Sequence, residues 1–412
     1  STLLASSAAS DVYKRQVGTG VYKLIERQRE ELPHKVGAGL TVSKVLVRDK
    51  NKKREGIDPS VLTDQWEDII TDDEIQIVVE VMGGIEPART YITEALQAGK
   101  NVVTANKDLM AVHGGELLDI ASHNGCDLLF EASVAGGIPI IRPLKQCLAG
   151  NYISEAMGIV NGTTNFILTK MTHEGMEFDE ALALATELGY AEADPTADVE
   201  GQDACRKIAI LSSLAYGRFL DFEKVYTEGI TKITPEDMEY AREMGRSIKL
   251  LGTSKKLGDD SFYALVAPFL VGQDNPLYGV KGVFNSIFVH GNMLGDAMFY
   301  GSGAGKLPTA SAVAADVVEA AKHLHDTIPN NWSNEEMTLM EPDSVEGRFF
   351  VRVKDTSLDE VDKAFGKVEA VIEPDSLPEE FGFITRLMTQ GEYKARVKAL
   401  GENVLGMIRV KD

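Results

Sequence analysis

The first third of the chain repeats one pattern, in which apolar runs alternate with amphipathic segments. Residues 40–47 and 75–82 are apolar runs typical of strands, and the second run suits a strand that is buried on both faces. Helical patterns lie over residues 21–32 and 86–98, and a further apolar run ends at Lys107. Strands that are separated by helices predict an α/β fold with a parallel sheet.

The pattern changes over residues 152–289, where helices are mixed with long apolar strands at 262–270 and 284–290. We predict an α+β domain here, whose sheet can serve as a dimer surface. A glycine-rich turn then runs into an alanine-rich helix over residues 309–325, which we expect to return and pack on the first domain.

The last part of the chain reads as strand, helix, two strands, helix and strand. This β-α-β-β-α-β order predicts a small ferredoxin-like domain. The predicted domains are a nucleotide-binding Rossmann domain at 17–135 with 305–330, a catalytic and dimerisation domain at 136–304, and the ferredoxin-like domain at 345–412.

Residues 1–16 do not continue the pattern. Residues 11–16 spell a string that a transposon end used in sequencing libraries encodes, so we interpret 1–16 as a cloning scar, with a natural polar leader as the alternative. A dinucleotide-binding domain begins with a strand and G-x-G-x-x-G, whose glycines let the backbone approach a pyrophosphate. Only V-G-T-G at 17–20 remains of that motif, so the first strand of the Rossmann-type sheet is predicted to be lost.

Residues 185–207 carry the clearest chemical signal. A helical pattern over 178–188 stops at Gly189, which can adopt the left-handed conformation that ends a helix. After a loop rich in carboxylates, the next helix opens with Asp203 and Lys207 on one face. Because this helix is apolar almost all round, the acid and the amine should face an interior or a cleft. An exposed ion pair is the common alternative.

This segment resembles the signature of the homoserine dehydrogenase family. The order and spacing of A, G-Y-A, D-P, D-V, G, D and K over residues 185–207 match that signature without a departure. The resemblance covers residues 17–330 closely and the tail less closely. It implies an NAD(P)-dependent oxidoreductase that interconverts L-homoserine and L-aspartate 4-semialdehyde, in the biosynthesis of threonine, methionine and isoleucine.

In the tail, the resemblance implies a regulatory ACT domain. The family has a D-R-P-G turn after the first strand of this domain, which helps to bind an amino-acid effector. Residues 355–359 read D-T-S-L-D instead and contain no glycine. This departure argues against control by threonine and leaves dimerisation as the alternative role.

The implied reaction needs a residue that takes the hydroxyl proton while hydride leaves for the nicotinamide, and a lysine can do this if burial lowers its pKa. The resemblance assigns this chemistry to Lys207, with Lys107 as a second candidate that polarises the carbonyl group. It assigns Glu192 and Asp203 to the substrate's ammonium group. Asp203 lies one turn before Lys207, so it can also orient the amine.

Two other sets of polar residues have a structural interpretation. N-G-T-T-N at 161–165 opens a helix, for which Thr163, Thr164 or Asn165 can be the cap. The family has the same motif near its substrate, and both interpretations stay open. We interpret Asp194 and Asp198 as loop-forming residues.

The second predicted strand ends at Arg48, where a dinucleotide-binding domain places its ribose-reading residue. Arg48 can meet a 2′-phosphate, whereas Asp49 can take the ribose hydroxyls, so we favour NADP over NAD. The cofactor contacts expected, mostly from the resemblance, are Val17, Gly18, Arg48, Lys107, Gly189 and Gly303.

A sodium site is implied by the resemblance alone. It uses the Glu131 carboxylate and the backbone carbonyl groups of Val134, Gly136 and Ile138. Oxygen ligands of these kinds suit a hard cation.

The composition of the chain argues against some classes of binding partner. The net charge of −21 argues against nucleic acid and anionic membranes, and no apolar run is long enough to span a bilayer. Three cysteines without metal-ligand spacing fit a reducing cytoplasm. We expect a small amino acid as the substrate and a homodimer or homotetramer as the assembly.

Two alternatives stay open. Another amino-acid-aldehyde oxidoreductase, such as an aspartate-semialdehyde dehydrogenase, would need a cysteine nucleophile, and Cys205 lies inside a predicted helix. The other alternative is a catalytically crippled homologue that only binds an amino acid, because its first strand is lost.

Overall fold

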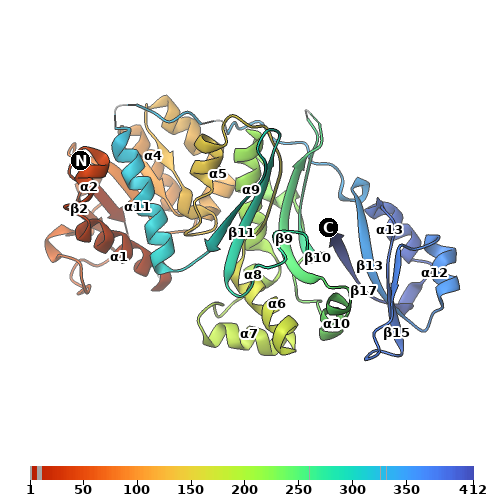
Figure 1. The fold of residues 1–412 in the computed structure, drawn as a ribbon. Coiled ribbons are helices and arrows are strands. Elements are labelled where there is room, and N and C mark those ends of the chain that lie inside the picture. The colour runs from red at the N-terminus through yellow and green to blue at the C-terminus, as the bar shows by residue number, and fades with distance from the viewer. Residues whose placement is uncertain (1, 7–11, 259, 325, 331) are drawn as a thin grey trace. The chain divides into compact units, whose positions relative to one another are not determined.

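The computed structural model describes residues 2–6, 12–258, 260–324, 326–330 and 332–412, with the main chain alone for residues 2–6 and 12–16. The described chain forms two compact units, each with its own hydrophobic core (Figure 1). Unit 1 comprises Ser1–Tyr152, Ala209–Phe222 and Phe299–Glu336, and unit 2 comprises Ile153–Ile208, Glu223–Met298 and Met337–Asp412.

A six-stranded parallel sheet lies at the centre of unit 1. Its order is β3-β2-β1-β4-β5-β6, which is that of a doubly wound dinucleotide-binding domain. The predicted Rossmann-type parallel sheet is therefore confirmed. The strands are β1 (Thr2–Ser6), β2 (Thr41–Leu46), β3 (Leu62–Thr63), β4 (Ile75–Glu80), β5 (Asn101–Thr104) and β6 (Leu128–Leu129).

The first strand of this sheet is present, so the prediction that it is lost is wrong. β1 lies between β2 and β4, with Thr2 opposite both Thr41 and Ile75. Strand pairing uses main-chain groups, which a short extended segment of almost any sequence supplies. The interpretation of residues 1–16 as a scar concerns their origin and stays a prediction. The connection at residues 7–11 lies outside the described residues.

Two helices of unit 1 approach each other at a glycine. α1 (Val12–Arg27) starts earlier than predicted, and α11 (Lys306–Lys322) lies beside it in Figure 1. A Cβ atom at Gly20 of α1 would lie 2.9 Å from the Cβ of Ala310, so the two helices pack more closely than an alanine would allow. The expected return of this second helix to the nucleotide-binding fold is confirmed. The other helices are α2 (Leu32–Val36), α3 (Glu67–Ile70), α4 (Ala88–Gln97) and α5 (Lys107–His123).

An eleven-stranded sheet runs through unit 2, with the main order β12-β11-β7-β9-β10-β17-β13-β15-β14. Neighbouring strands from β11 to β10 are antiparallel, whereas β8 pairs in parallel with β10, so the sheet is mixed. Its first strands are β7 (Ile153–Ile159), β8 (Tyr226–Thr227), β9 (Ser247–Lys256), β10 (Phe262–Val271), β11 (Phe284–Gly291) and β12 (Gly295–Ser302).

The C-terminal part of the chain has the predicted β-α-β-β-α-β order and continues this sheet. Neighbours in the order β17-β13-β15-β14 are antiparallel, which is a ferredoxin-like arrangement. β17 also pairs in parallel with β10, with Arg409 opposite Phe269. The elements of this C-terminal module are β13 (Glu346–Lys354), α12 (Leu358–Phe365), β14 (Ala370–Ile372), β15 (Glu380–Ile384), β16 (Met388–Thr389), α13 (Gln390–Val397) and β17 (Val404–Lys411).

The remaining helices are on the chain between β7 and β9. Of the helices that the structure describes, none combines the length and the hydropathy that crossing a bilayer needs. These helices are α6 (Gly162–Glu174), α7 (Phe178–Glu187), α8 (Thr196–Val199), α9 (Gln202–Tyr216) and α10 (Pro235–Glu243).

Candidate active site

The candidate site begins where α7 ends. Gly189 has φ +76°, and its amide donates to the carbonyl oxygen of Thr186, so the predicted left-handed helix end is confirmed. The loop after it contains Glu192, which is exposed, and Asp194, whose side chain accepts from the Thr196 amide at 3.1 Å. Hydrogen bonds from the Thr196 side chain and amide lower the pKa of Asp194, which confirms the loop-forming role of this residue.

Lys207 and Asp203 form a buried ion pair on α9. The Lys207 Nζ lies 2.7 Å from Asp203 Oδ2 and 2.8 Å from the carbonyl oxygen of Val160, at the end of β7. The side chains are 12% and 3% exposed, so the alternative of a solvated surface pair is wrong. Within the described residues these partners use two of the three ammonium donors of Lys207.

Asn161 joins this pair to a second carboxylate. Its Nδ2 donates to Asp203 Oδ2 at 2.9 Å and to Asp198 Oδ1 at 2.7 Å. Asp198 therefore belongs to the same hydrogen-bonded network as the ion pair, although we predicted only a loop-forming role for it. One amide donating to two carboxylates fixes both of them relative to the amine.

The same asparagine begins α6. Its Oδ1 accepts from the Thr164 amide at 2.8 Å, so Asn161 is the N-cap and the predicted caps Thr163, Thr164 and Asn165 are wrong. Asparagine is among the best N-caps, and a cap precedes the first helical residue. Several residues of the N-G-T-T-N motif are of types that cap helices, so the sequence pattern alone does not show at which of them the helix begins.

Lys107 lies in unit 1, at the carboxyl end of β5, as predicted. It is the first residue of α5, which Asn106 caps by accepting from the Leu109 amide. Asn106 also donates to the Gly84 carbonyl oxygen at 2.7 Å, in the loop after β4. The Glu80 carboxylate, which sequence reasoning missed, holds that loop by accepting from the Gly83 amide at 3.0 Å. Open α/β sheets bind ligands at this edge.

The other predicted cofactor residues are spread over unit 1, except Gly189, which lies in unit 2. Arg48 is exposed and follows β2, as expected. Val17 and Gly18 are buried within α1, five and six residues after its first residue, so they do not form the glycine-rich turn itself. Gly303 is buried in the turn before α11, and its carbonyl oxygen faces Gly136, where a Cβ would lie 2.8 Å from the Gly303 carbonyl carbon.

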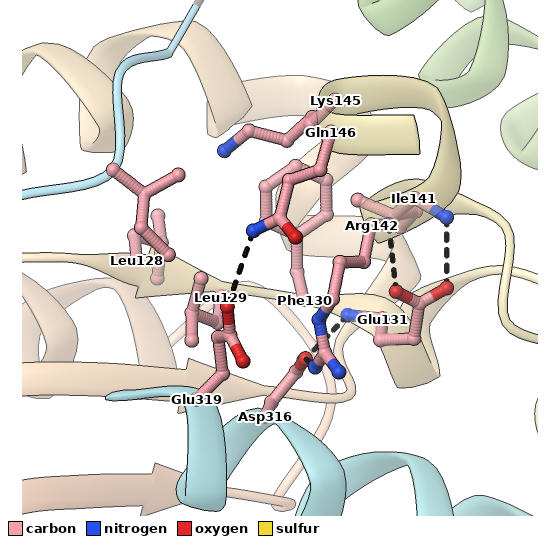
Figure 2. A pocket seen from close by; sticks show the side chains of 11 residues that line it. Leu128, Leu129, Phe130, Glu131, Ile141, Arg142, Lys145, Gln146, Asp316 and Glu319 are labelled. Atoms are coloured by element: carbon pink, nitrogen blue, oxygen red, sulfur yellow. Dashed lines mark hydrogen bonds and ion pairs between the residues drawn. The ribbon is translucent and has the colours of Figure 1, made fainter. Parts of the chain in front are cut away.

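The Glu131 carboxylate caps a helical segment. It accepts from the amides of Ile141 at 2.7 Å and Arg142 at 2.8 Å, as Figure 2 shows. It also accepts from the Ile140 amide at 2.5 Å. A carboxylate that accepts hydrogen bonds from three amides is stabilised in its charged form by main-chain donors. It therefore does not fit the expected sodium ligand. No group of three or more acidic, histidine or cysteine residues that could hold a metal ion is found in the part of the chain that the structure describes.

A second buried acid supports this cap (Figure 2). Asp316 on α11 accepts from the Glu131 amide at 2.7 Å and forms a 2.8 Å ion pair with the Arg142 guanidinium. Burial and the nearby Glu131 charge raise the pKa of Asp316 to about 7. These three residues also line a small pocket with Lys145, whose pKa is lowered by burial. Through these bonds Asp316 links α11 to both Glu131 and Arg142.

Comparison with known proteins finds two family models that match successive parts of the chain. A model described as the NAD-binding domain of homoserine dehydrogenase matches residues 16–131, and a homoserine dehydrogenase model matches residues 139–318. A homoserine dehydrogenase of Bacillus subtilis is 45% identical over 341 residues, which are 82% of this chain and 78% of that protein.

Two solved structures are similar as well. A homoserine dehydrogenase from Thiobacillus denitrificans is similar over 100% of this chain and 99% of its own, with a TM-score of 0.90 and 34% identity. A hyperthermophilic archaeal homoserine dehydrogenase in complex with NADPH is similar over 80% of this chain and 99% of its own, with a TM-score of 0.64 and 27% identity.

Proposed function

Because the chain belongs to the homoserine dehydrogenase family, we propose that Lys207, oriented by Asp203, moves the hydroxyl proton of the substrate. The chain interconverts L-homoserine and L-aspartate 4-semialdehyde with NAD(P), within amino-acid biosynthesis of the aspartate pathway. The alternative of an aspartate-semialdehyde dehydrogenase is thereby excluded. Its required cysteine nucleophile is also not matched by Cys205, which is buried in α9.

One observation carries the proposal, namely that the Lys207 ammonium is held by Asp203 and the Val160 carbonyl oxygen with one donor left. That donor can bond the aldehyde oxygen of the semialdehyde and transfer a proton to it as the alcohol forms. In the reverse direction the amine takes the proton back. A bound nicotinamide supplies or accepts the hydride. We assign Glu192 and Asp203 to the substrate's ammonium group, since both are anionic, Asp203 on α9 and Glu192 in the loop that precedes it.

The test follows the absorbance of reduced nicotinamide with aspartate semialdehyde as the substrate. We expect Lys207→Ala to lower kcat by about 10²- to 10⁴-fold, the usual contribution of general acid–base catalysis. The matched control is Lys170→Ala, which breaks the exposed i,i+4 ion pair with Glu174 on α6 and should change kcat by less than about twofold. Full activity of Lys207→Ala would contradict the assignment. If the unaltered chain shows no turnover, it is the crippled homologue that only binds its substrate.

We propose NADP as the preferred cofactor, bound by unit 1. Arg48 after β2 would meet the 2′-phosphate, and Lys107 and Gly303 are further candidate contacts. Contacts from Val17 and Gly18, which are buried in α1, stay a prediction. The sheet order and the loop after β4 fit such a cofactor. Arg48→Ala should lower kcat/KM for NADPH more than for NADH, and equal losses would contradict the preference.

The sodium ion stays a prediction for the carbonyl oxygens of Val134, Gly136 and Ile138, and the reaction proposed above does not depend on it. A role in cofactor contact for Gly189, which ends α7, also stays a prediction. A cytoplasmic location is part of the proposal, supported by Cys126, Cys147 and Cys205, which are all free thiols.

We propose that a second copy of the chain covers the β11–β12 edge of the large sheet. β12 is an edge strand, and such edges are normally blocked or covered. Apolar side chains are exposed there, with Met293 82%, Leu294 49% and Met298 44% exposed. Sedimentation of the unaltered protein should give a dimer or tetramer, and Met298→Glu should shift it toward the monomer. A monomeric unaltered protein would contradict this.

We propose an ACT-like identity for the C-terminal module, on the basis of its ferredoxin-like order. Asp355, in the turn that departs from the family, has φ +48°, a conformation that glycine adopts more easily. Because residues 355–359 read D-T-S-L-D in place of the D-R-P-G turn, isothermal titration with L-threonine should give no binding heat, whereas saturable heat would show that the module senses this amino acid.

A further inference from the structure

The turn that precedes α9, residues 199–201, packs closely against residues 227–230, a segment later in the chain. The amide of Ile230 donates to the Val199 carbonyl oxygen at 2.8 Å. A Cβ atom at Gly229 would lie 2.5 Å from the Glu200 Cα, so only glycine allows the two main chains to approach this closely. The Thr231 hydroxyl adds a 3.1 Å bond to Glu200 Oε1.

Gly201 contacts the same segment and is hydrogen-bonded to the first turn of α9. It has φ +80°, and a Cβ there would lie 3.2 Å from Thr227 Cγ2. Its carbonyl oxygen accepts from the Cys205 amide at 2.9 Å, which is a hydrogen bond of the first turn of α9. Asp203 lies in that turn and Lys207 in the next one. Residues 227–230 therefore contact the turn from which the first turn of α9 starts, and this first turn contains Asp203.

Arg409, on β17 of the C-terminal module, holds residues 227–230. Its Nη1 donates to Glu228 Oε2 at 2.8 Å, and the Tyr226 hydroxyl donates to the same oxygen at 3.2 Å. The guanidinium also lies over the Tyr226 ring, with its carbon 5.2 Å from the ring centroid. The Arg409 and Glu228 side chains are 7% and 24% exposed, so this is a partly buried charged hydrogen bond and not a fully solvated surface pair.

We infer that Arg409 is a positioning residue for the reaction. Its hydrogen bond to Glu228 fixes the segment on which the 199–201 turn rests, and that turn sets the first residues of α9. The C-terminal module thus contributes to the geometry of Asp203 and Lys207 without touching the substrate. The inference rests on the proposed role of Lys207 in proton transfer.

The first test compares Arg409→Met with Lys411→Met. Lys411 is two residues further along β17 and pairs with Glu155 at 2.9 Å, so its loss also breaks an ion pair of this strand but leaves Glu228 untouched. We expect Arg409→Met to lower kcat about tenfold at a temperature where both variants are folded, because small displacements of a catalytic group are costly. KM for NADPH should be unchanged, Arg409→Lys should restore part of kcat, and Lys411→Met should match the unaltered chain. Equal kcat values for Arg409→Met and Lys411→Met would overturn the inference.

The second test separates this inference from the role of Lys207. In a Lys207→Ala background, Arg409→Met should cause no further loss of kcat, because the residue that it positions is gone; an undiminished tenfold loss there would overturn the inference. Hydrogen exchange gives a readout that does not depend on activity. The peptide that contains the Cys205 amide should exchange faster in Arg409→Met than in Lys411→Met, and equal exchange would overturn it. Lys207→Ala can be fully active while Arg409→Met still speeds hydrogen exchange of this peptide. In that case the proposed role of Lys207 is wrong, and only the structural coupling between Arg409 and the start of α9 is supported.

Discussion

Asn161 is joined to Asp203 by a 2.9 Å hydrogen bond, although the two residues are 42 positions apart in the chain. The same side chain begins α6, so one residue both starts a helix and orients the carboxylate that holds Lys207. A substitution can separate these two roles.

Asn161→Ser should keep the cap and lose the bond to Asp203, whereas Asn161→Ala should lose both. We expect both variants to lower kcat about tenfold, since a hydrogen bond to a charged group contributes roughly 1.5 kcal/mol. Only Asn161→Ala should also lose about 1 kcal/mol of unfolding free energy through the missing cap. Steady-state kinetics and urea unfolding measure the two effects, and a full kcat in Asn161→Ser would show that Asp203 needs no such support.

Lys249 on β9 should make the stability of the protein depend on pH. Its Nζ donates to the Val280 carbonyl oxygen and lies 3.3 Å from Asn165 Oδ1, and burial, with the charge of Lys281, lowers its pKa to about 8. The unfolded chain holds this proton up to about pH 10.5, so below pH 8 both states are charged and the cost of burying the charge is fully present. Between pH 8 and 10.5 the folded state alone is neutral, so the free energy of unfolding should rise, by up to about 3 kcal/mol.

Chemical denaturation of the unaltered chain and of Lys249→Met isolates this effect from other titrating groups. The difference in unfolding free energy between the two should change between pH 8 and 10.5 and stay constant below pH 8. A difference that does not depend on pH would contradict the burial of a charged Lys249.

Arg352 on β13 should contribute strongly to stability, because its partners are also buried. Its Nη1 lies 2.8 Å from Asp237 Oδ1 on α10, and its Nη2 lies 3.1 Å from the Glu380 carboxylate. Arg352→Met leaves both acids without their partner and should cost about 3–5 kcal/mol of unfolding free energy. Arg348→Met, four residues earlier on the same strand, breaks only exposed pairs and should cost at most about 1 kcal/mol. Similar losses in the two variants would mean that the Arg352 network is not effectively buried.

Glu131→Gln tests whether the carboxylate serves the main chain or a metal. The neutral side chain keeps one acceptor oxygen for the three amides, so the unfolding free energy should fall by about 1–3 kcal/mol. The loss should be the same in sodium chloride and in potassium chloride. A loss seen only in sodium chloride would restore this carboxylate as a sodium ligand.

Local sequence relationships were predicted well. Gly189 and the Asp203–Lys207 pair depend on residues within one or two turns, and the periods of the apolar runs located β2, β4 and β5 of the parallel sheet. The C-terminal module followed from the same periods, since each of its elements is a separate short pattern.

Relationships between distant residues were not predictable in this way. The bonds of Asn161 to Asp198 and Asp203 span 37 and 42 residues, and an asparagine before a helix carries no sign of which carboxylate it will meet. The amides that Glu131 caps have no side-chain signature, so the pattern could not distinguish a helix cap from a metal ligand. β1 was missed because a five-residue strand without a glycine motif after it has too little pattern to recognise.

The pairing of β17 with β10 has a consequence for how this protein can be shortened. β10 is buried at nine of its ten residues, and at its carboxyl end Phe269, Leu270 and Val271 are paired with β17. A chain cut before β13 would leave those main-chain groups as a bare edge of an apolar strand, which is a template for aggregation. The C-terminal module is therefore not a detachable accessory, and any shorter relative of this protein must seal that edge with another segment.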